Sequence, residues 1–395
     1  MTSLKNLLAL AAGAIVGAIV LIAPASAATL TQVTGFGSNP GNLSMYHYKP
    51  DGLANGHPVV VLLHGCTQNA SGYFTNSGWR KFADQHGFAL VVPQTSTANQ
   101  MLGCFTWYEP GDISRGQGEA LSIRNMVGHA ISNLGGSASN VYVSGLSAGG
   151  AMAAVMLATY PDLFKAGSIA AGIPYKCATS SSGTSACQYS GVEKSPQQWG
   201  DLVRNAYTGY SGPYPRVAIW QGTSDGTVVP KNATELVDQW TNLRGVSQTP
   251  TSTSSLPSGT SLSVYGNNDV RLYRISNMGH GLPVDPGSAA TQCGTAASYF
   301  LDTICSAYHD TVFFGLSGGV QPSPTASPTA SPTTSPTSAP VCVTSSNYTH
   351  TTAGRAYHSL GYTYANGSNQ NMGLWNTFQQ TTLKQTGPNY WVIGC

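Results

Sequence analysis

Residues 141–150 have the sequence VYVSGLSAGG and lead directly into the alanine-rich run AMAAVMLA at residues 151–158. β-Branched and aromatic residues favour a strand, whereas the run that follows favours a helix. The chain must therefore change from strand to helix within the Gly-x-Ser-x-Gly motif centred on Ser147, which predicts a nucleophile elbow. Gly145 and Gly149 are expected where no Cβ atom would fit. The alternative is a turn of small residues in which Ser147 merely begins the helix.

Strand and helix patterns alternate on both sides of this motif. The predicted strands are Leu43–Lys49, Pro58–Leu63, Phe88–Pro93, Lys165–Gly172, Val217–Trp220 and Val270–Ile275. The predicted helices are Gly78–His86, Gly116–Leu134 and Asn232–Leu243, and irregular loops are expected over Ile173–Pro215 and Gln248–Ser263. Continuous apolar strands that alternate with helices indicate an α/β fold with a doubly wound, mostly parallel sheet.

Three residues with complementary chemistry each follow a predicted strand: Ser147, Asp225 and His280. A serine hydroxyl needs a base to take its proton, and that base needs an acid to orient it. Open α/β sheets expose their ligand sites at the carboxyl ends of strands, and the order Ser, Asp, His is that of α/β hydrolases. Gly279 and Gly281 flank the histidine and allow backbone to approach it closely.

Other residues compete for two of these roles. His64 is an alternative base, although it fits better as part of a His-Gly turn that shapes a neighbouring loop, or as a core histidine. Asp201, Asp238 and Asp285 are alternative acids. Asp225 is preferred because it directly follows a strand, although the acid of such a triad can move between strands.

An oxyanion intermediate needs two hydrogen-bond donors. One is expected to be the backbone N–H of Ala148, directly after the serine, and the other an N–H from the loop Gly65-Cys66-Thr67 after the first buried strand. We assign the second to Cys66, with its side chain tied to Cys104. The alternative is that Cys66 serves only as a disulfide staple.

The N-terminus, residues 1–27, has the features of a secretory signal peptide. Lys5 precedes an apolar stretch from Leu7 to Ile22, and Ala25-x-Ala27 resembles a cleavage site. The mature chain is then expected to begin at Ala28 and to be secreted, with no membrane attachment after cleavage. A retained membrane anchor is the alternative, but no basic stop-transfer cluster follows.

Charge and cysteine content limit the possible partners. Charged residues make up 8% of the chain and the formal net charge is +2, which argues against nucleic acid and anionic lipid. Eight cysteines in an exported chain suggest disulfides rather than metal ligands, and we expect neither a metal nor another cofactor. Of 105 possible pairings, sequence-adjacent pairing is the simplest. It predicts Cys66–Cys104, Cys177–Cys187, Cys293–Cys305 and Cys342–Cys395.

Composition divides the rest of the chain. Residues 28–320 carry the strand and helix pattern, and residues 321–340 are almost wholly Ser, Pro, Thr and Ala. Such a linker favours extended polyproline II, with a reach of roughly 60 Å. Residues 341–395 then form a small domain that needs a disulfide staple. Its aromatic residues form either a binding surface or a small core: Tyr357, Tyr362, Tyr364, Trp375, Tyr390 and Trp391.

Several motifs together resemble the extracellular polyhydroxybutyrate depolymerases and their esterase relatives. They are LHGCTQ at 63–68, CxxWY at 104–108, RGxGE at 115–119, GLSAG at 145–149, WQGTxD at 220–225 and GHGxPVDPG at 279–287. The resemblance covers residues 42–316. It implies Ser147 as nucleophile, His280 as base, Asp225 as its acid and Trp107 as a wall of the acyl site, unless Trp107 is an ordinary core residue. The last domain resembles the unit with which some of these enzymes hold the polymer.

The sequence therefore favours a secreted serine esterase, expected to be a monomer, that hydrolyses solid poly(3-hydroxybutyrate)-type polyester through an acyl-enzyme. The nearest alternative is a carbohydrate esterase acting on acetyl xylan or feruloyl esters. An alternative of another class is a non-catalytic polymer-binding protein on a hydrolase scaffold, which the complete set of Ser147, Asp225 and His280 argues against.

Overall fold

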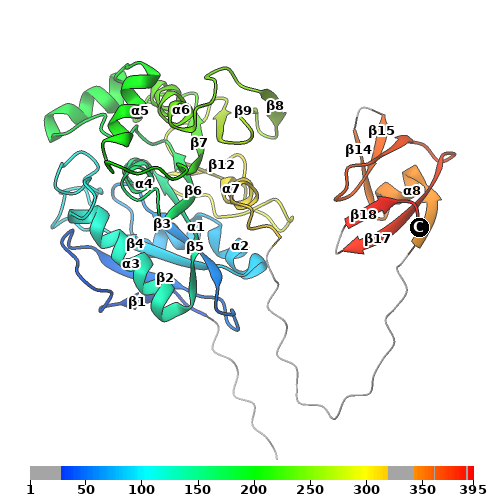
Figure 1. Cartoon of the computed structure of the whole chain (residues 1–395), viewed down its shortest axis with the longest axis horizontal. Coiled ribbons are helices and arrows are strands. Elements are labelled where there is room, and N and C mark those ends of the chain that lie inside the picture. The colour runs from blue at the N-terminus through cyan, green and yellow to red at the C-terminus, as the bar shows by residue number, and fades with distance from the viewer. Residues whose placement is uncertain (1–27, 319–341, 360, 388–389) are drawn as a thin grey trace, which may run out of the picture. The chain divides into compact units, whose positions relative to one another are not determined.

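The computed structural model describes residues 28–318, 342–359, 361–387 and 390–395. The chain divides into two compact units, one reaching Thr325 and the other beginning at Ala326. Figure 1 draws the larger unit from blue to yellow and the smaller one in orange and red. The signal peptide predicted at 1–27 and the linker predicted at 321–340 both lie outside the described residues.

A ten-stranded sheet forms the centre of the larger unit. In spatial order its strands are β1 (Thr31–Val33), β2 (Ser44–Tyr48), β4 (Ala89–Gln94), β3 (His57–Leu63), β5 (Gly136–Leu146), β6 (Phe164–Ala170), β7 (Arg216–Gly222), β10 (Val270–Ile275), β9 (Thr260–Tyr265) and β8 (Ser252–Leu256). The six strands from β4 to β10 pair in parallel, and the strands outside them pair antiparallel. The carboxyl ends of the parallel strands therefore meet at one edge of the sheet.

Helices cover both faces of this sheet. One core cluster joins it to α3 (Gly118–Leu134), α4 (Ala148–Thr159), α5 (Pro196–Arg204) and α6 (Lys231–Arg244). The other joins it to α1 (Ala70–Asn76), α2 (Trp79–His86) and α7 (Ser306–Phe314). In β3, Val59 and Val61 belong to the first cluster while Val60 and Leu62 belong to the second, so the strand is buried on both faces. The predicted α/β-hydrolase class is confirmed.

Two segments differ from the predicted loops. Residues 173–215 were expected to be irregular, but they contain α5 and two short helical turns, η1 (Ser181–Gly183) and η2 (Ala186–Ser190). Ser195 and Gln198 form a capping box at the start of α5, and Pro196 occupies its first turn. This helix was missed because its polar face masks the apolar spacing, although the capping signal is present in the sequence.

The prediction of a polar loop over Gln248–Ser263 is also wrong. Strands β8 and β9 form an antiparallel hairpin there, with Leu256 opposite Thr260. Ser258 and Gly259 both adopt positive φ in the turn. Because β8 lies at the sheet edge and its side chains are largely exposed, the segment lacks the apolar run that identifies the central strands. Two short strands that were not predicted, β11 (Leu282–Val284) and β12 (Phe300–Asp302), form a separate parallel pair.

The smaller unit contains two three-stranded sheets and one short helix. Its first sheet is β13 (Cys342–Ser346), β17 (Gln380–Gly387) and β18 (Tyr390–Ile393), its second is β14 (Ala356–Ser359), β15 (Tyr362–Ala365) and β16 (Asn371–Leu374), and its helix is α8 (Asn347–Thr352). The described core of this unit consists of Ala356, Ala365, Met372, Leu383 and Trp391. So small a core is consistent with the need for a covalent staple.

Four disulfides join the cysteines. They are Cys66–Cys104, Cys177–Cys187, Cys293–Cys305 and Cys342–Cys395, the sequence-adjacent pairs. Disulfides of this number are typical of proteins that fold in oxidising, extracellular compartments. Within the described ranges, no helix has both the length and the apolarity needed to cross a bilayer.

Candidate active site

Ser147 occupies the turn between β5 and α4. Its backbone adopts φ 58° and ψ −121°, a conformation that L-residues rarely adopt. A Cβ atom at Gly145 would overlap the carbonyl oxygen of Gly149, and one at Gly149 would overlap the carbonyl oxygens of Leu63 and His64. Both glycines are therefore needed for the backbone to pass this closely while the serine side chain is displayed.

The structure brings Ser147, His280 and Asp225 together from the ends of β5, β10 and β7. His280 Nε2 lies 2.9 Å from Ser147 Oγ, and His280 Nδ1 lies 2.8 Å from Asp225 Oδ2. The aspartate is 3% exposed and the serine 9% exposed. With Nδ1–H donating to the carboxylate, Nε2 is left as the acceptor for the serine hydroxyl proton.

Asp225 is fixed by donors from its own loop. Its Oδ1 accepts hydrogen bonds from the N–H groups of Thr227 and Val228, at 2.8 and 2.9 Å. Its Oδ2 accepts a further bond from Gln221 Nε2 at 3.3 Å. These three donors hold the carboxylate in place beside His280. Gln221 was not singled out from the sequence as a site residue, although it lies within the WQGTxD motif.

The alternative acids lie in other surroundings. Asp201 pairs with Arg204 at 2.8 Å on α5. Asp285 accepts a hydrogen bond from Gln292 at 3.1 Å. Burial and nearby carboxylates raise the pKa of Asp238 to about 6, on α6. None of the three has a hydrogen bond to His280 among the described residues.

His64 is a buried histidine that uses both ring nitrogens. The N–H of Thr95 donates to Nε2 at 3.3 Å, so Nδ1 carries the proton and donates to the carbonyl of Gly65 at 2.8 Å. Burial lowers the pKa of His64 to about 4, which keeps the ring neutral. Because C=O and N–H point in opposite directions across a trans peptide, holding the Gly65 carbonyl also orients the N–H of Cys66.

Two backbone N–H groups lie free near the serine. That of Ala148 is at the first helical position of α4, where no intrahelical acceptor exists. That of Cys66 has no acceptor within the described ranges. The Cys66 segment is tied by the disulfide to Cys104 and by the bond from Thr67 N–H to Leu102 O at 2.7 Å. Cys66 and Ser147 line the same pocket.

Glu119 is a buried carboxyl next to this loop system. It accepts hydrogen bonds from the N–H of Thr106 at 2.8 Å and from the Thr95 hydroxyl at 3.4 Å. Burial raises its pKa to about 8, and the nearby charge of Asp112 adds to the effect. The RGxGE motif was the sequence signal for this residue, but its contact with the segment that holds His64 depends on the fold.

Trp107 does not line the pocket over Ser147. It is 5% exposed and shares a buried cluster with Ala148 and Ala151 at the start of α4. Its ring meets that of Tyr108 edge to face, with centroids 5.3 Å apart. In this structure the tryptophan therefore packs within the cluster that supports the serine turn.

The pocket at the triad has a volume of about 210 Å³. Its lining residues are Gly65, Cys66, Thr67, Gln68, Leu102, Leu146, Ser147, Gln188, Tyr189, Thr227, His280 and Tyr299. None of these is Asp, Glu, Lys or Arg. Leu102, Tyr189 and Tyr299 belong to no motif identified in the sequence, because they come together only when three distant loops fold over the same sheet edge.

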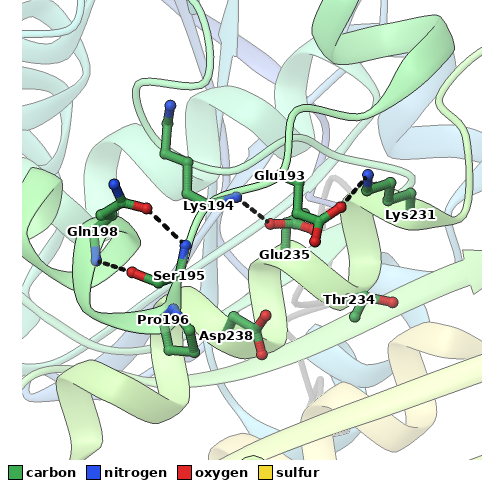
Figure 2. Close-up of a pocket in the computed structure, with 9 residues that line it drawn as sticks. All are labelled: Glu193, Lys194, Ser195, Pro196, Gln198, Lys231, Thr234, Glu235 and Asp238. Carbon is green, nitrogen blue, oxygen red and sulfur yellow. Dashed lines mark hydrogen bonds and ion pairs between the residues drawn. The ribbon is translucent and has the colours of Figure 1, made fainter.

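A larger hollow of about 760 Å³ lies between the segment before α5 and the helix α6 (Figure 2). Lys231 Nζ lies 2.9 Å from Glu193 in this hollow, and the backbone N–H of Lys194 donates to Glu235 (Figure 2). Glu235 also accepts a hydrogen bond from Trp199 Nε1. None of the predicted catalytic residues lines it. These contacts are typical of a solvated surface groove.

Comparison with known proteins supports an esterase. The family model for Esterase PHB depolymerase matches residues 43–255. Poly(3-hydroxyalkanoate) depolymerase C of Paucimonas lemoignei is 49% identical over 76% of this chain and 73% of its own length, and acetylxylan esterase of Coprinopsis cinerea is 41% identical over 65% and 70%. Among solved structures, acetyl xylan esterase from Aspergillus awamori superposes with a TM-score of 0.63 at 30% identity, over 73% of this chain and 99% of that one. The chain therefore belongs to the esterase PHB depolymerase family, the family that its sequence motifs resemble, and is a carboxylic ester hydrolase.

Proposed function

We propose that the protein is a secreted, monomeric serine esterase that hydrolyses poly(3-hydroxybutyrate)-type polyesters. The observation that carries this proposal is the hydrogen-bonded series Ser147, His280 and Asp225 at an uncharged pocket. Residues 28–320 are assigned as the catalytic domain and 341–395 as a polymer-binding domain. Residues 1–27 are the signal peptide and 321–340 the tether.

Catalysis begins at the serine. His280 Nε2 takes the Ser147 proton while Oγ attacks the ester carbonyl, and Asp225 stabilises the imidazolium that forms. The N–H groups of Ala148 and Cys66 receive the oxyanion, with His64 holding the Gly65–Cys66 peptide in place. Collapse of the intermediate releases the hydroxyl-ended part of the chain, which takes the proton from His280. Water then repeats the sequence and frees the acid end of the product from Ser147.

The substrate assignment rests on two observations. The relative named as a poly(3-hydroxyalkanoate) depolymerase is more similar to this chain than the acetylxylan esterase, at 49% against 41% identity. No Asp, Glu, Lys or Arg lines the pocket, which suits a neutral ester. In the depolymerase reaction, the acyl group that binds here is a segment of the polymer itself.

The smaller unit exposes much of its aromatic surface. Trp391 belongs to its core, whereas Trp375, Tyr357, Tyr362 and Tyr390 are between 37% and 45% exposed. The Trp375 ring stacks on His358, with centroids 4.1 Å apart, and also contacts Tyr348. Exposed aromatic rings held against one another are suited to adhesion to an apolar solid.

The test is product release from two solids. Wild-type protein should release 3-hydroxybutyrate units from a polyhydroxybutyrate film faster than acetate from acetylated xylan, and Ser147→Ala should release neither. The carbohydrate esterase is the second candidate, supported by the similarity to two acetylxylan esterases. Faster release from xylan would favour it, and turnover by Ser147→Ala would contradict both.

A further inference from the structure

Large exposed apolar side chains of the larger unit concentrate at the mouth of the Ser147 pocket. Within residues 28–318, the exposed side chains of this kind are Met101, Leu102, Tyr189, Tyr299 and Val312. Three of the five line the pocket, and Met101 directly precedes one of them. We refer to Met101, Leu102, Tyr189 and Tyr299 as the apolar rim. Exposed apolar side chains gathered around a pocket mark an interaction site.

The first part of the apolar rim is held rigidly to the oxyanion loop. Leu102 lies two residues before Cys104, which is bonded to Cys66. Its carbonyl accepts from Thr67 N–H at 2.7 Å, and its N–H donates to Gln100 Oε1 at 2.7 Å. Met101, which directly precedes Leu102, is 82% exposed.

The second part, Tyr189, follows Cys187 by two residues within η2. Cys187 is bonded to Cys177, and its carbonyl accepts from Asn232 Nδ2 at 2.8 Å. The carbonyl of Gln188 accepts from Val229 N–H at 2.9 Å, which joins this segment to the loop that follows Asp225. The tyrosine ring is nevertheless 58% exposed.

The third part, Tyr299, lies in the loop closed by Cys293–Cys305. Its φ of 65° is rare for an aromatic residue and is held by the bond from Leu282 N–H to its carbonyl at 2.8 Å. Its ring centroid is 6.1 Å from that of His280. Each of the three disulfides of the larger unit therefore braces one part of the apolar rim.

The Met101–Leu102 part of the apolar rim favours a polyester over a sugar, whereas the two tyrosines suit either partner. A surface fixed in advance loses little conformational entropy when it makes contact. Met101 and Leu102 offer neither a flat ring for stacking on a sugar nor a polar group, and no Asp, Glu, Lys or Arg lines the pocket that they border. We propose that the apolar rim seats the larger unit directly on solid, uncharged polyester, independently of the smaller unit. This inference rests on the proposed polyesterase function.

The experiment uses the full chain and two matched pairs of variants, Met101→Ser with Met101→Leu and Tyr189→Ser with Tyr189→Phe. For each, the release of 3-hydroxybutyrate units per adsorbed molecule on a film is divided by the turnover of p-nitrophenyl butyrate. Normalising to adsorbed protein removes the contribution of the smaller unit to adhesion, and the ratio removes any general loss of activity.

We expect both serine variants to lower this ratio about threefold to tenfold, because each loses one apolar side chain that the polymer would cover on contact. Both conservative variants should stay near wild type. Ratios of Met101→Ser and Tyr189→Ser equal to wild type would overturn the proposal. So would an equal loss in Tyr189→Phe and Tyr189→Ser, since the hydroxyl would then be the contact, as for a polysaccharide. A wild-type protein inactive on film but active on acetylated xylan would instead overturn the proposed function, and the polyester partner with it.

Discussion

The serine turn of the larger unit is buried, whereas the aromatic surface of the smaller unit is exposed, and their proposed roles require this difference. Around Ser147, glycines admit close backbone contacts and every member of the triad is hydrogen-bonded and largely buried. In the smaller unit, aromatic rings such as Trp375 and Tyr362 remain exposed over a core of few residues. Ester chemistry needs atoms fixed within tenths of an ångström, whereas adhesion to a solid needs exposed apolar area. The predictions below alter one region at a time.

The largest effect is expected from Ser147→Ala. Loss of the nucleophile should lower turnover of p-nitrophenyl butyrate by roughly 10⁶-fold, as for other serine hydrolases. Adsorption to polyhydroxybutyrate film should not change, because the aromatic surface of the smaller unit is intact. Steady-state kinetics and a depletion assay measure the two properties. Residual activity of more than a few per cent would mean that another residue is the nucleophile.

The second-largest effect is expected from removing the disulfide Cys66–Cys104, which holds the proposed oxyanion loop. The double variant Cys66→Ser/Cys104→Ser should lower kcat on the soluble ester by about 10-fold to 100-fold, because the N–H of Cys66 loses its fixed position. The matched control is Cys177→Ser/Cys187→Ser, which removes the disulfide beside Tyr189 at the pocket mouth but leaves the Cys66 segment tied, and should affect kcat less. Circular dichroism establishes that both variants are folded. Equal kcat values for the two double variants would contradict the role of Cys66.

Removal of the smaller unit should have a selective effect. A chain that ends at Gly319 keeps the triad and the oxyanion loop, so it should hydrolyse p-nitrophenyl butyrate at the full rate. On film it should act about tenfold more slowly, because the smaller unit no longer raises the local enzyme concentration at the surface. Equal losses on both substrates would show that the smaller unit belongs to the catalytic fold. Equal retention would show that it does not bind this polymer.

The smallest effect is expected for Glu119→Gln, on the pH dependence of the melting temperature. Burial raises the pKa of Glu119 from 4.5 to about 8. Its protonated form therefore contributes stability that is fully present below about pH 4.5 and is lost as the pH rises through about 8. Glu119→Gln replaces the protonated carboxyl with a neutral amide of similar shape. As the pH rises from 5 to 8.5, the Tm of this variant minus the Tm of wild type should therefore increase by a few degrees.

The control for this comparison is Glu109→Gln. Within the described ranges, the side-chain carboxyl of Glu109 accepts no hydrogen bond from Thr95 or Thr106, whose hydroxyl groups donate to Glu119 and Asp112. The Tm of this control should follow wild type across the same range. Thermal melts at half-unit pH intervals provide the measurement. Parallel curves for wild type and Glu119→Gln would show that Glu119 does not titrate within this window.

Local sequence determined much of this protein. The strand-to-helix turn at Ser147 could be placed from the spacing of Gly145 and Gly149 around it. The contact that requires Gly145 is local, whereas the contacts that require Gly149 are with Leu63 and His64 at the end of another strand. The central parallel strands are recognisable because burial on both faces demands continuous apolar runs, as in β3. Ser147, Asp225 and His280 could be nominated because each motif follows such a strand, and the disulfide pairs could be proposed from adjacency alone.

The tertiary structure decided what depends on contacts between distant segments. The edge hairpin β8–β9 is a strand pair because it extends an existing sheet, and its exposed side chains carry no apolar signal. Trp107 fits the motif of a pocket wall, yet packing places it in a buried cluster beside α4. Tertiary contacts likewise determine which residues surround Gln221, Glu119 and the apolar rim. Backbone conformation is set over a few residues, whereas burial and hydrogen-bond partners are set by which loops the whole fold brings together.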